Sequence, residues 1–127
     1  MVVDSDIIIR FLTNDDLTKA KRFQVKLLSK QKFTLTDVTF AEVYWTLRSF
    51  YKFTKTQVID CLEALIVTSS ITCNRDILEN TLRLLRSKNI SFIDAYTATY
   101  ATAKENGKVM SYDRGFDKIS GLTRFEP

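Results

Sequence analysis

The chain has 127 residues, 45% of them hydrophobic and 27% charged, which suffices for one folded domain with its own core but not for two. Nineteen Lys and Arg residues against fifteen Asp and Glu give a net charge of +4, only weak support for a polyanionic partner. The absence of histidine excludes Ser-His-Asp and Cys-His triads, paired-histidine ribonucleases and histidine-ligated zinc.

Hydrophobic spacing predicts short strands that alternate with helices. In chain order, the pattern predicts a strand at 2–3, helices that begin near 7 and 17, a strand at 33–38, helices at 40–50 and 55–65, a strand at 70–73, helices at 76–86 and 92–104, a strand at 108–112, a short helix at 114–119 and a last strand at 122–125. Asn106-Gly107 is typical of a helix C-cap.

This alternation indicates an α/β fold, a single domain over residues 1–127 in which a short parallel sheet is flanked by helices on both faces. With only three glycines, and its one proline in last place, the chain favours long elements over a turn-rich all-β fold. In a parallel sheet the strand carboxyl ends and the following helix N-termini share one edge, where ligands bind. We therefore look for chemistry at that edge.

The chain also carries hints about its compartment. No run approaches the roughly 18 apolar residues that a membrane span needs, and the first residues lack the features of a secretory signal. Cys61 and Cys73 have no CxxC-type spacing, so we expect packed thiols in a reducing compartment, with a disulfide as the alternative. These features predict a cytoplasmic protein without a membrane partner.

Four acidic residues lie where a predicted strand has just ended or a predicted helix is beginning: Asp4, Glu42, Asp94 and Asp113. Each has a simpler explanation as part of a helix cap. Thr39-x-x-Glu42 fits a capping box and Ser91-x-x-Asp94 is close to one, while the other two acids would serve as N-caps.

The conjunction of the four acids favours a metal site, because a parallel sheet would bring all four to the same edge. Asp94 shares a helical stripe with Ala98 and Ala101, so it should face the packed side of its helix. Carboxylates brought together repel one another, and their pKa values rise unless a cation compensates them. Oxygen ligands without His or Cys suit Mg²⁺ or Mn²⁺, which polarise a phosphodiester and activate a bound water.

The ordered set of motifs resembles the PIN-domain family over the stretch from Val2 to Phe125. The resemblance is carried by Val-Val-Asp-Ser-Asp at 2–6, Ala-Glu-Val-Tyr-Trp-Thr-Leu at 41–47, Phe-Ile-Asp-Ala-Tyr-Thr-Ala-Thr-Tyr-Ala at 92–101 and Ser-Tyr-Asp-Arg-Gly-Phe-Asp-Lys-Ile-Ser-Gly-Leu at 111–122. No single motif is specific, but their order and separations are similar to those of the family.

Length and layout look most like the VapC toxins of bacterial and archaeal toxin–antitoxin pairs, which cleave RNA and are held inactive by a small partner. The resemblance implies an endoribonuclease with catalytic roles for Asp4, Glu42, Asp94 and Asp113, of which Asp4, Asp94 and Asp113 would bind the metal. It implies Mg²⁺ or Mn²⁺ as cofactor, RNA as substrate, and an antitoxin and a second copy of the chain as partners.

Secondary roles are implied for residues beside the acids: Ser5, Asp6, Ser111 and Asp117. Asp6 departs from the family, in which Asn is usual; the extra carboxylate would alter metal binding or would only cap the helix. Arg10 and Arg114 are close enough in the predicted layout to hold scissile phosphates, with a solvated or salt-bridged surface as the alternative.

Two further surfaces are candidates for partners. The aromatic residues at 40–53 exceed what one helix face can bury, so we expect Phe40, Tyr44 and one later ring in the core and the rest at an interface. Base stacking is the alternative use of those rings. The basic run at 19–32 is typical of a solvated helix face, and an RNA track is the second interpretation.

Two other functions compete with the nuclease. A receiver-type signalling domain also has an acidic pocket, and Asp37 would mimic its phosphoacceptor, but Lys108 begins its strand instead of ending it. A catalytically inactive PIN-like module that binds RNA or protein is the other alternative. The presence of all four acids argues against it.

Overall fold

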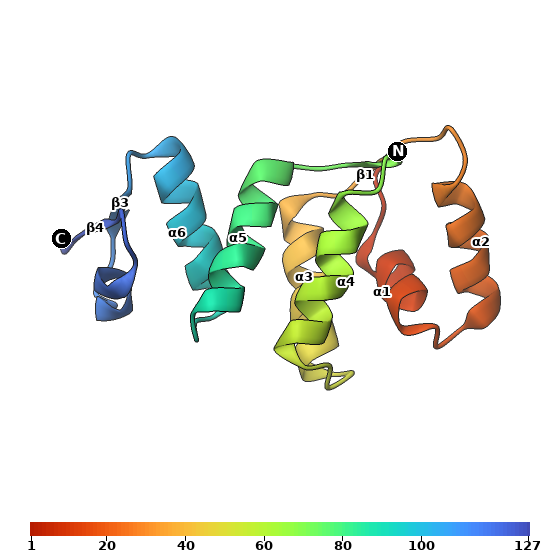
Figure 1. The fold of residues 1–127 in the computed structure, drawn as a ribbon, viewed down its shortest axis with the longest axis horizontal. Coiled ribbons are helices and arrows are strands. Elements are labelled where there is room, and N and C mark those ends of the chain that lie inside the picture. Colours follow the sequence, from red (N-terminus) through yellow and green to blue (C-terminus); the bar gives the residue numbers. More distant parts are fainter. The chain divides into compact units, whose positions relative to one another are not determined.

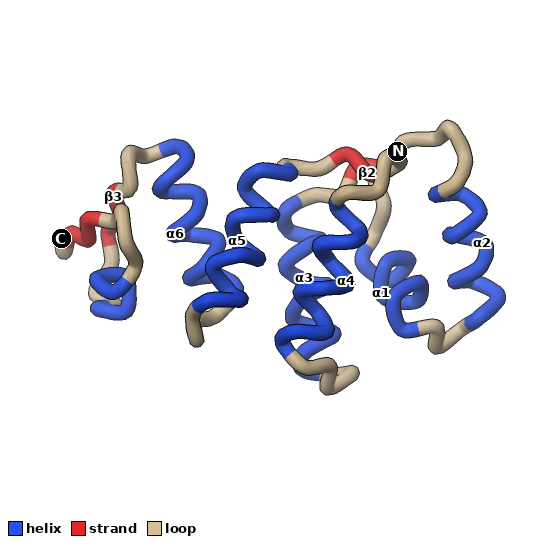
Figure 2. The backbone as a smooth tube through the Cα atoms, in the orientation of Figure 1, coloured by secondary structure: helices blue, strands red, loops and turns tan.

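A computed structural model describes residues 1–127, which divide into two compact units, Met1–Arg75 (unit 1) and Asp76–Pro127 (unit 2). Figure 1 labels the elements along the chain, and Figure 2 shows that helices make up most of it while the strands are short. Each unit has one parallel pair of strands. The predicted α/β class with parallel pairing is therefore confirmed.

The strands of unit 1 are β1 (Phe33–Thr34) and β2 (Ile71–Thr72), with Phe33 opposite Ile71. On the other side of β1, Val2 forms a parallel bridge with Thr34, and the Val3 amide donates to the Thr34 carbonyl at 3.0 Å. The predicted strand at 2–3 is thus a single bridge, and the one predicted at 33–38 is only two residues long.

Four helices belong to unit 1: α1 (Ser5–Thr13), α2 (Leu17–Leu27), α3 (Asp37–Ser49) and α4 (Lys55–Ile66). Helix α1 packs on α2 and α3, and α3 packs on α4. Each helix buries an apolar stripe, with Ile8, Leu47 and Leu62 fully buried. Phe23 joins α2 to the strands through an edge-to-face contact with Phe33.

Helix α3 begins three residues earlier than its predicted start at Phe40. The Thr36 hydroxyl accepts a hydrogen bond from the Thr39 amide at 3.2 Å, which makes Thr36 the N-cap, and Asp37 places an acid in the first turn. This start also truncates the strand that was predicted to reach Val38. Because Asp37 is the first helical residue, it does not end a strand as the phosphoacceptor of a receiver domain would.

Unit 2 contains α5 (Arg75–Ser87) from its second residue onward, α6 (Phe92–Lys104), β3 (Lys108–Met110), the 3-10 helix η1 (Arg114–Lys118) and β4 (Thr123–Phe125). Its core cluster combines α6, β3 and η1, through Ala98, Ala101, Val109, Phe116 and Ile119. Strand β3 pairs in parallel with β4, so that Val109 lies opposite Arg124. The bounds of α6 are those predicted from the sequence.

The predicted cap at the end of α6 is confirmed. Asn106 and Gly107 both have positive φ, and the Gly107 amide donates to the Ala101 carbonyl at 2.9 Å. A Cβ at Gly107 would lie 2.2 Å from the carbonyl oxygen of Gly121. Only glycine therefore fits at this point, where the chain turns from α6 into β3.

Two further predictions concern the whole chain. None of the helices combines the length and apolar character needed to cross a bilayer. Cys61 and Cys73 are both thiols and do not form a disulfide, as predicted. Burial raises the pKa of Cys61, which makes its thiol less reactive than an exposed one.

Candidate functional site

Asp4 follows the Val2 bridge and occupies the N-cap position of α1 with extended backbone angles. Its side chain makes no capping hydrogen bond, unlike that of Asp16, which caps α2 by accepting from the Lys19 amide at 3.0 Å. The prediction that the Asp4 carboxylate caps its helix is therefore wrong. The side chain is exposed, with both oxygens open to a ligand.

Glu42 lies on the second turn of α3, six residues after the N-cap Thr36. The predicted capping box with Thr39 is therefore wrong, because the helix has already begun at Asp37 and its first turn is capped without Glu42. Glu42 is exposed, and its carboxylate makes no hydrogen bond or ion pair within unit 1. The capping explanation consequently fails for this acid as well.

The strand register relates these two acids within unit 1. Val2 pairs with Thr34, so Asp4 and the N-terminus of α3 both follow the carboxyl ends of neighbouring parallel strands. At 1.5 Å per residue, Glu42 lies about 8 Å along α3 from its first residue. Helix α3 also packs on α1, whose first turn begins beside Asp4.

The other predicted site residues of unit 1, Ser5, Asp6 and Arg10, all lie on α1. Ser5 is buried and Asp6 is exposed in the first turn of α1. Arg10 approaches Asp15 at 3.9 Å, and the same carboxylate accepts a hydrogen bond from the Tyr51 hydroxyl at 2.9 Å. This hydrogen bond raises the pKa of Tyr51. Arg10 thus has a partner, and phosphate binding by this residue stays a prediction.

In unit 2, Asp94 lies in the first turn of α6. Ser91 is the N-cap, as predicted, and its hydroxyl accepts from the Asp94 amide at 3.1 Å. The Asp94 carboxylate makes no hydrogen bond or ion pair within its unit, so the second hydrogen bond of a capping box, from the Ser91 amide to the Asp94 side chain, is absent. Ala98 and Ala101 are buried on the same stripe, and Asp94 is half-buried. The prediction that this stripe faces the packed side is confirmed.

Asp113 is the N-cap of η1, and here the capping prediction is confirmed. Its Oδ1 accepts a hydrogen bond from the Gly115 amide at 2.8 Å. The Asp113 amide in turn donates to the Ser111 hydroxyl at 3.0 Å, which gives this predicted secondary residue an observed contact. Only one carboxylate oxygen is used in the cap, so the second can still coordinate a cation.

Asp117 is held by Arg124, a residue that no motif in the sequence marks. Two parallel contacts join the pair, from Nε to Oδ1 at 3.0 Å and from Nη2 to Oδ2 at 3.3 Å. Nη1 also donates to Glu126 at 2.7 Å. These hydrogen bonds, of which the one to Asp117 has the largest effect, raise the pKa of Arg124.

Arg114 is exposed at the start of η1 and has no ion-pair partner within unit 2.

The donor set fits a hard divalent cation in its chemistry. The chain has no histidine, and the candidate ligands all present carboxylate oxygens, which Mg²⁺ and Mn²⁺ prefer. Three of these carboxylates have no competing partner within their units, and the fourth keeps one oxygen open. No group of three or more His, Cys, Asp or Glu residues gathers in either unit. Neither unit alone therefore supplies a complete metal site.

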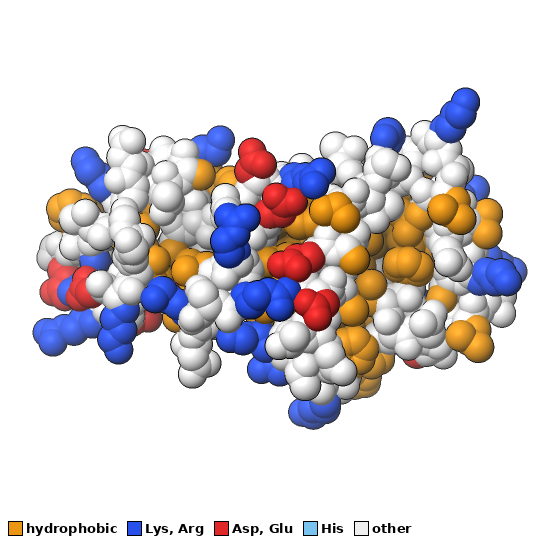
Figure 3. Space-filling view, in the orientation of Figure 1, with side chains coloured by type: hydrophobic (Ala, Val, Ile, Leu, Met, Phe, Trp, Pro, Cys, Tyr) orange, Lys and Arg blue, Asp and Glu red, His pale blue; other side chains and the backbone are white.

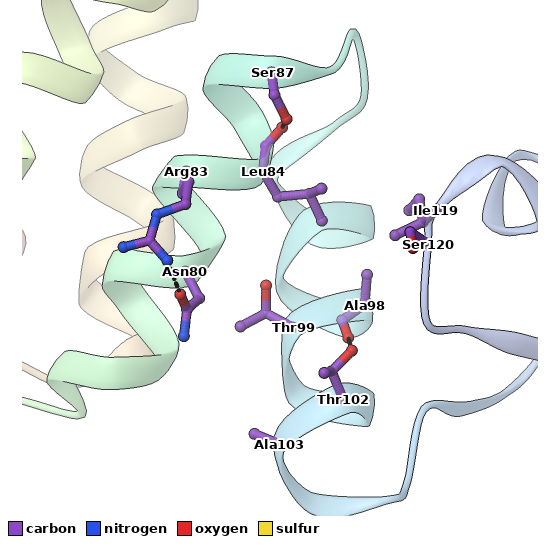
Figure 4. A pocket seen from close by; sticks show the side chains of 10 residues that line it. All are labelled: Asn80, Arg83, Leu84, Ser87, Ala98, Thr99, Thr102, Ala103, Ile119 and Ser120. Atoms are coloured by element: carbon purple, nitrogen blue, oxygen red, sulfur yellow. Dashed lines mark hydrogen bonds between the residues drawn. The ribbon is translucent and has the colours of Figure 1, made fainter.

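A groove of about 430 Å³ also lies in unit 2, between α5, α6 and the residues after η1 (Figure 4). Leu84, Ala98 and Ile119 contribute apolar surface to it. Arg83 lies on its lining and donates to the Asn80 side chain at 2.5 Å. No carboxylate lines this groove, so we do not assign the metal chemistry to it.

The exposed surface of unit 1 bears on the predicted partners. Phe40 and Tyr44 are buried, as predicted, whereas Trp45 is 67% and Phe50 is 74% exposed. Helix α2 has no acidic residue, and exposed apolar side chains such as Leu17 stand among its lysines. Figure 3 shows hydrophobic and basic side chains interspersed over this helix. The exposed rings and the basic face remain predicted binding surfaces.

The fold is similar to the crystal structure of VapC20 from Mycobacterium tuberculosis, a sarcin–ricin loop cleaving toxin. The match covers 95% of this chain and 95% of the VapC20 chain, with 14% sequence identity and a TM-score of 0.44. None of the curated proteins matches the sequence. The family model described as the PIN domain matches residues 1–122, which include all four candidate acids. The match sets the receiver-type alternative aside, and the chain belongs to the PIN-domain family.

Proposed function

We propose that the chain is a metal-dependent endoribonuclease in which Asp4, Glu42, Asp94 and Asp113 together form one acidic site. The observation that carries the proposal is that the simpler explanation fails for three of these acids, whereas Asp113 caps η1 with only one of its two oxygens. Asp4 and Glu42 make no capping hydrogen bonds, and the Asp94 carboxylate has no partner within its unit. These carboxylates are therefore not committed to capping the helices, so they are available to a cation or a substrate.

The proposal requires the two units to act as one domain, since each contributes two of the four acids. Asp4, Asp94 and Asp113 would hold Mg²⁺ or Mn²⁺, which when bound polarises a phosphodiester and lowers the pKa of a water molecule. Glu42 would orient or deprotonate the attacking water as a general base. Membership of the PIN-domain family and the order of the motifs support this assignment.

Residues beside the acids would serve the substrate and the site's geometry. Arg114, which is exposed one residue after Asp113, would hold a phosphate next to the cleaved bond. Arg10 would do so after releasing Asp15, to which its contact of 3.9 Å is weak. Ser5 and Asp6 would adjust the surroundings of Asp4 at the start of α1.

Cleavage of RNA is expected to stop in excess EDTA and to return when Mn²⁺ or Mg²⁺ is added, because no other group in the chain replaces the cation. A closed circular single-stranded RNA is the sharpest substrate, because only an endonuclease can cut it. The Asp113→Asn variant, purified in the same way, controls for contaminating ribonucleases. Undiminished cleavage by the wild-type protein in EDTA would remove the metal from the proposal.

We also propose that the protein is the toxin of a toxin–antitoxin pair, acts in the cytoplasm, and forms a homodimer that a small partner protein holds inactive. The exposed rings of Trp45 and Phe50 support a protein interface on unit 1, since large exposed aromatic residues anchor partners. Induced expression without a partner is expected to arrest growth, whereas the Asp113→Asn variant at equal abundance does not. Normal growth with abundant soluble wild-type protein would contradict the toxin assignment.

A further inference from the structure

The guanidinium of Arg124 makes four hydrogen bonds within unit 2. It donates twice to Asp117, once to Glu126 and once to the Ser111 carbonyl, the last at 2.8 Å. These bonds use four of its five N–H groups. Only 12% of the Arg124 side chain is exposed, against 51% of Asp117, so the arginine is the more enclosed member of the pair.

The partners of Arg124 bracket Asp113 in the sequence. Ser111 precedes Asp113 by two residues, and Asp117 follows it by four, on η1. Between these points the segment has its own hydrogen bonds, from the Asp113 amide to Ser111 and from the Gly115 amide to the Asp113 side chain. Arg124 reaches both ends because β4, on which it lies, pairs in parallel with β3.

We infer that Arg124 is a positioning residue that fixes the direction of the Asp113 carboxylate by clamping the loop on both sides of it. The consequence for metal binding rests on the proposed function. A metal ligand must hold its oxygen in place, and residues that orient a ligand change affinity although they do not touch the ion. The same geometry assigns Asp117 to the clamp, because the arginine fork engages both of its oxygens.

Arg124→Lys separates the clamp from a simple charge effect. Lysine keeps the positive charge, but its single ammonium cannot reproduce the planar fork that reaches the Ser111 carbonyl and both Asp117 oxygens. We expect Arg124→Lys and Arg124→Met to weaken Mn²⁺ binding similarly, by about 10- to 100-fold in a calorimetric titration. If charge alone mattered, Arg124→Lys would bind Mn²⁺ as the wild type does, which would overturn the inference.

A double variant tests whether the effect passes through Asp113. Arg124→Met added to Asp113→Asn is expected to cause no further loss of Mn²⁺ affinity, because the residue being positioned has already lost its charge. Additive losses would mean that Arg124 acts elsewhere. Arg48→Met is the matched control, since Arg48 also donates to a backbone carbonyl, that of Phe53 at 2.9 Å, but lies in unit 1. It should leave Mn²⁺ affinity unchanged.

A metal-free measurement keeps this inference apart from the proposed function. In EDTA, hydrogen exchange of the Gly115 amide reports its bond to Asp113, and it should be faster in both Arg124 variants while the α6 amides exchange at wild-type rates. Unchanged exchange at Gly115 would overturn the positioning role. If exchange at Gly115 is faster in the Arg124 variants but the wild-type protein binds no Mn²⁺, the positioning role of Arg124 is supported and the metal-dependent function is contradicted.

Discussion

Replacing Asp113 with asparagine is expected to leave the metal-free fold intact while RNA cleavage is lost. The Asn side chain retains the oxygen that accepts from the Gly115 amide, so the free energy of unfolding in EDTA should stay within about 1 kcal/mol of the wild type. Relief of repulsion between carboxylates can even raise it. The loss of the negative charge should lower the rate of RNA cleavage by more than about 100-fold. That is a larger effect than the roughly 10- to 100-fold loss expected when a residue that only orients a metal ligand is removed.

Asp16→Asn is the matched control for this experiment. Asp16 caps α2 through the same kind of bond, to the Lys19 amide at 3.0 Å, and it is not among the candidate site residues. That hydrogen bond lowers the pKa of Asp16, as expected for a carboxylate that caps a helix. Both variants should unfold near the wild-type urea concentration, but only Asp113→Asn should lose cleavage. Wild-type cleavage by Asp113→Asn would leave Asp113 as a cap and nothing more.

Glu42→Gln is the second substitution with a large expected effect, and it tests unit 1. The side chain is exposed on α3 and makes no hydrogen bond there, so the free energy of unfolding should change by less than about 0.5 kcal/mol. Cleavage of RNA should fall by orders of magnitude, because glutamine can neither accept a proton from water nor contribute charge to the site.

Glu105→Gln provides the comparison for Glu42→Gln. Glu105 is an exposed glutamate at the end of α6, and it carries none of the proposed chemistry. Single-turnover cleavage of the same RNA by both variants separates a specific loss from a general effect of charge. Equal activity in the two variants would mean that Glu42 is only a surface residue. The proposal that Glu42 acts as the general base would then be wrong.

The sequence predicted local features well where one signal stood alone. The bounds of α6 follow from Ser91 as its N-cap and from Asn106-Gly107 at its end, and both caps are observed. The start of α3 was mispredicted because Thr36 and Thr39 offer competing caps three residues apart. The earlier cap prevails because each further residue in the helix adds a backbone hydrogen bond once the helix is nucleated.

Features that depend on distant partners were beyond the sequence. The length of β1 is set by its partners, Val2 on one side and Ile71 on the other. The Thr-rich pattern of the segment itself therefore predicted a longer strand than the two residues observed. Arg124 has no local motif, because its contacts to Ser111 and Asp117 arise from the parallel pairing of β3 with β4. By contrast, the positions of Asp4, Asp94 and Asp113 at element ends were visible from periodicity and caps alone, whereas Glu42 lies on the second turn of α3 and not at its start.

Calorimetric titration with Mn²⁺ of the wild-type chain, Asp4→Asn and Asp113→Asn tests most directly whether acids of both units serve one cation. We expect Mn²⁺ to bind the wild type at pH 7 and to bind both variants more weakly, although one substitution lies in each unit. Both variants should also show a smaller rise in melting temperature with Mn²⁺. Wild-type Mn²⁺ affinity in either variant would contradict a shared site.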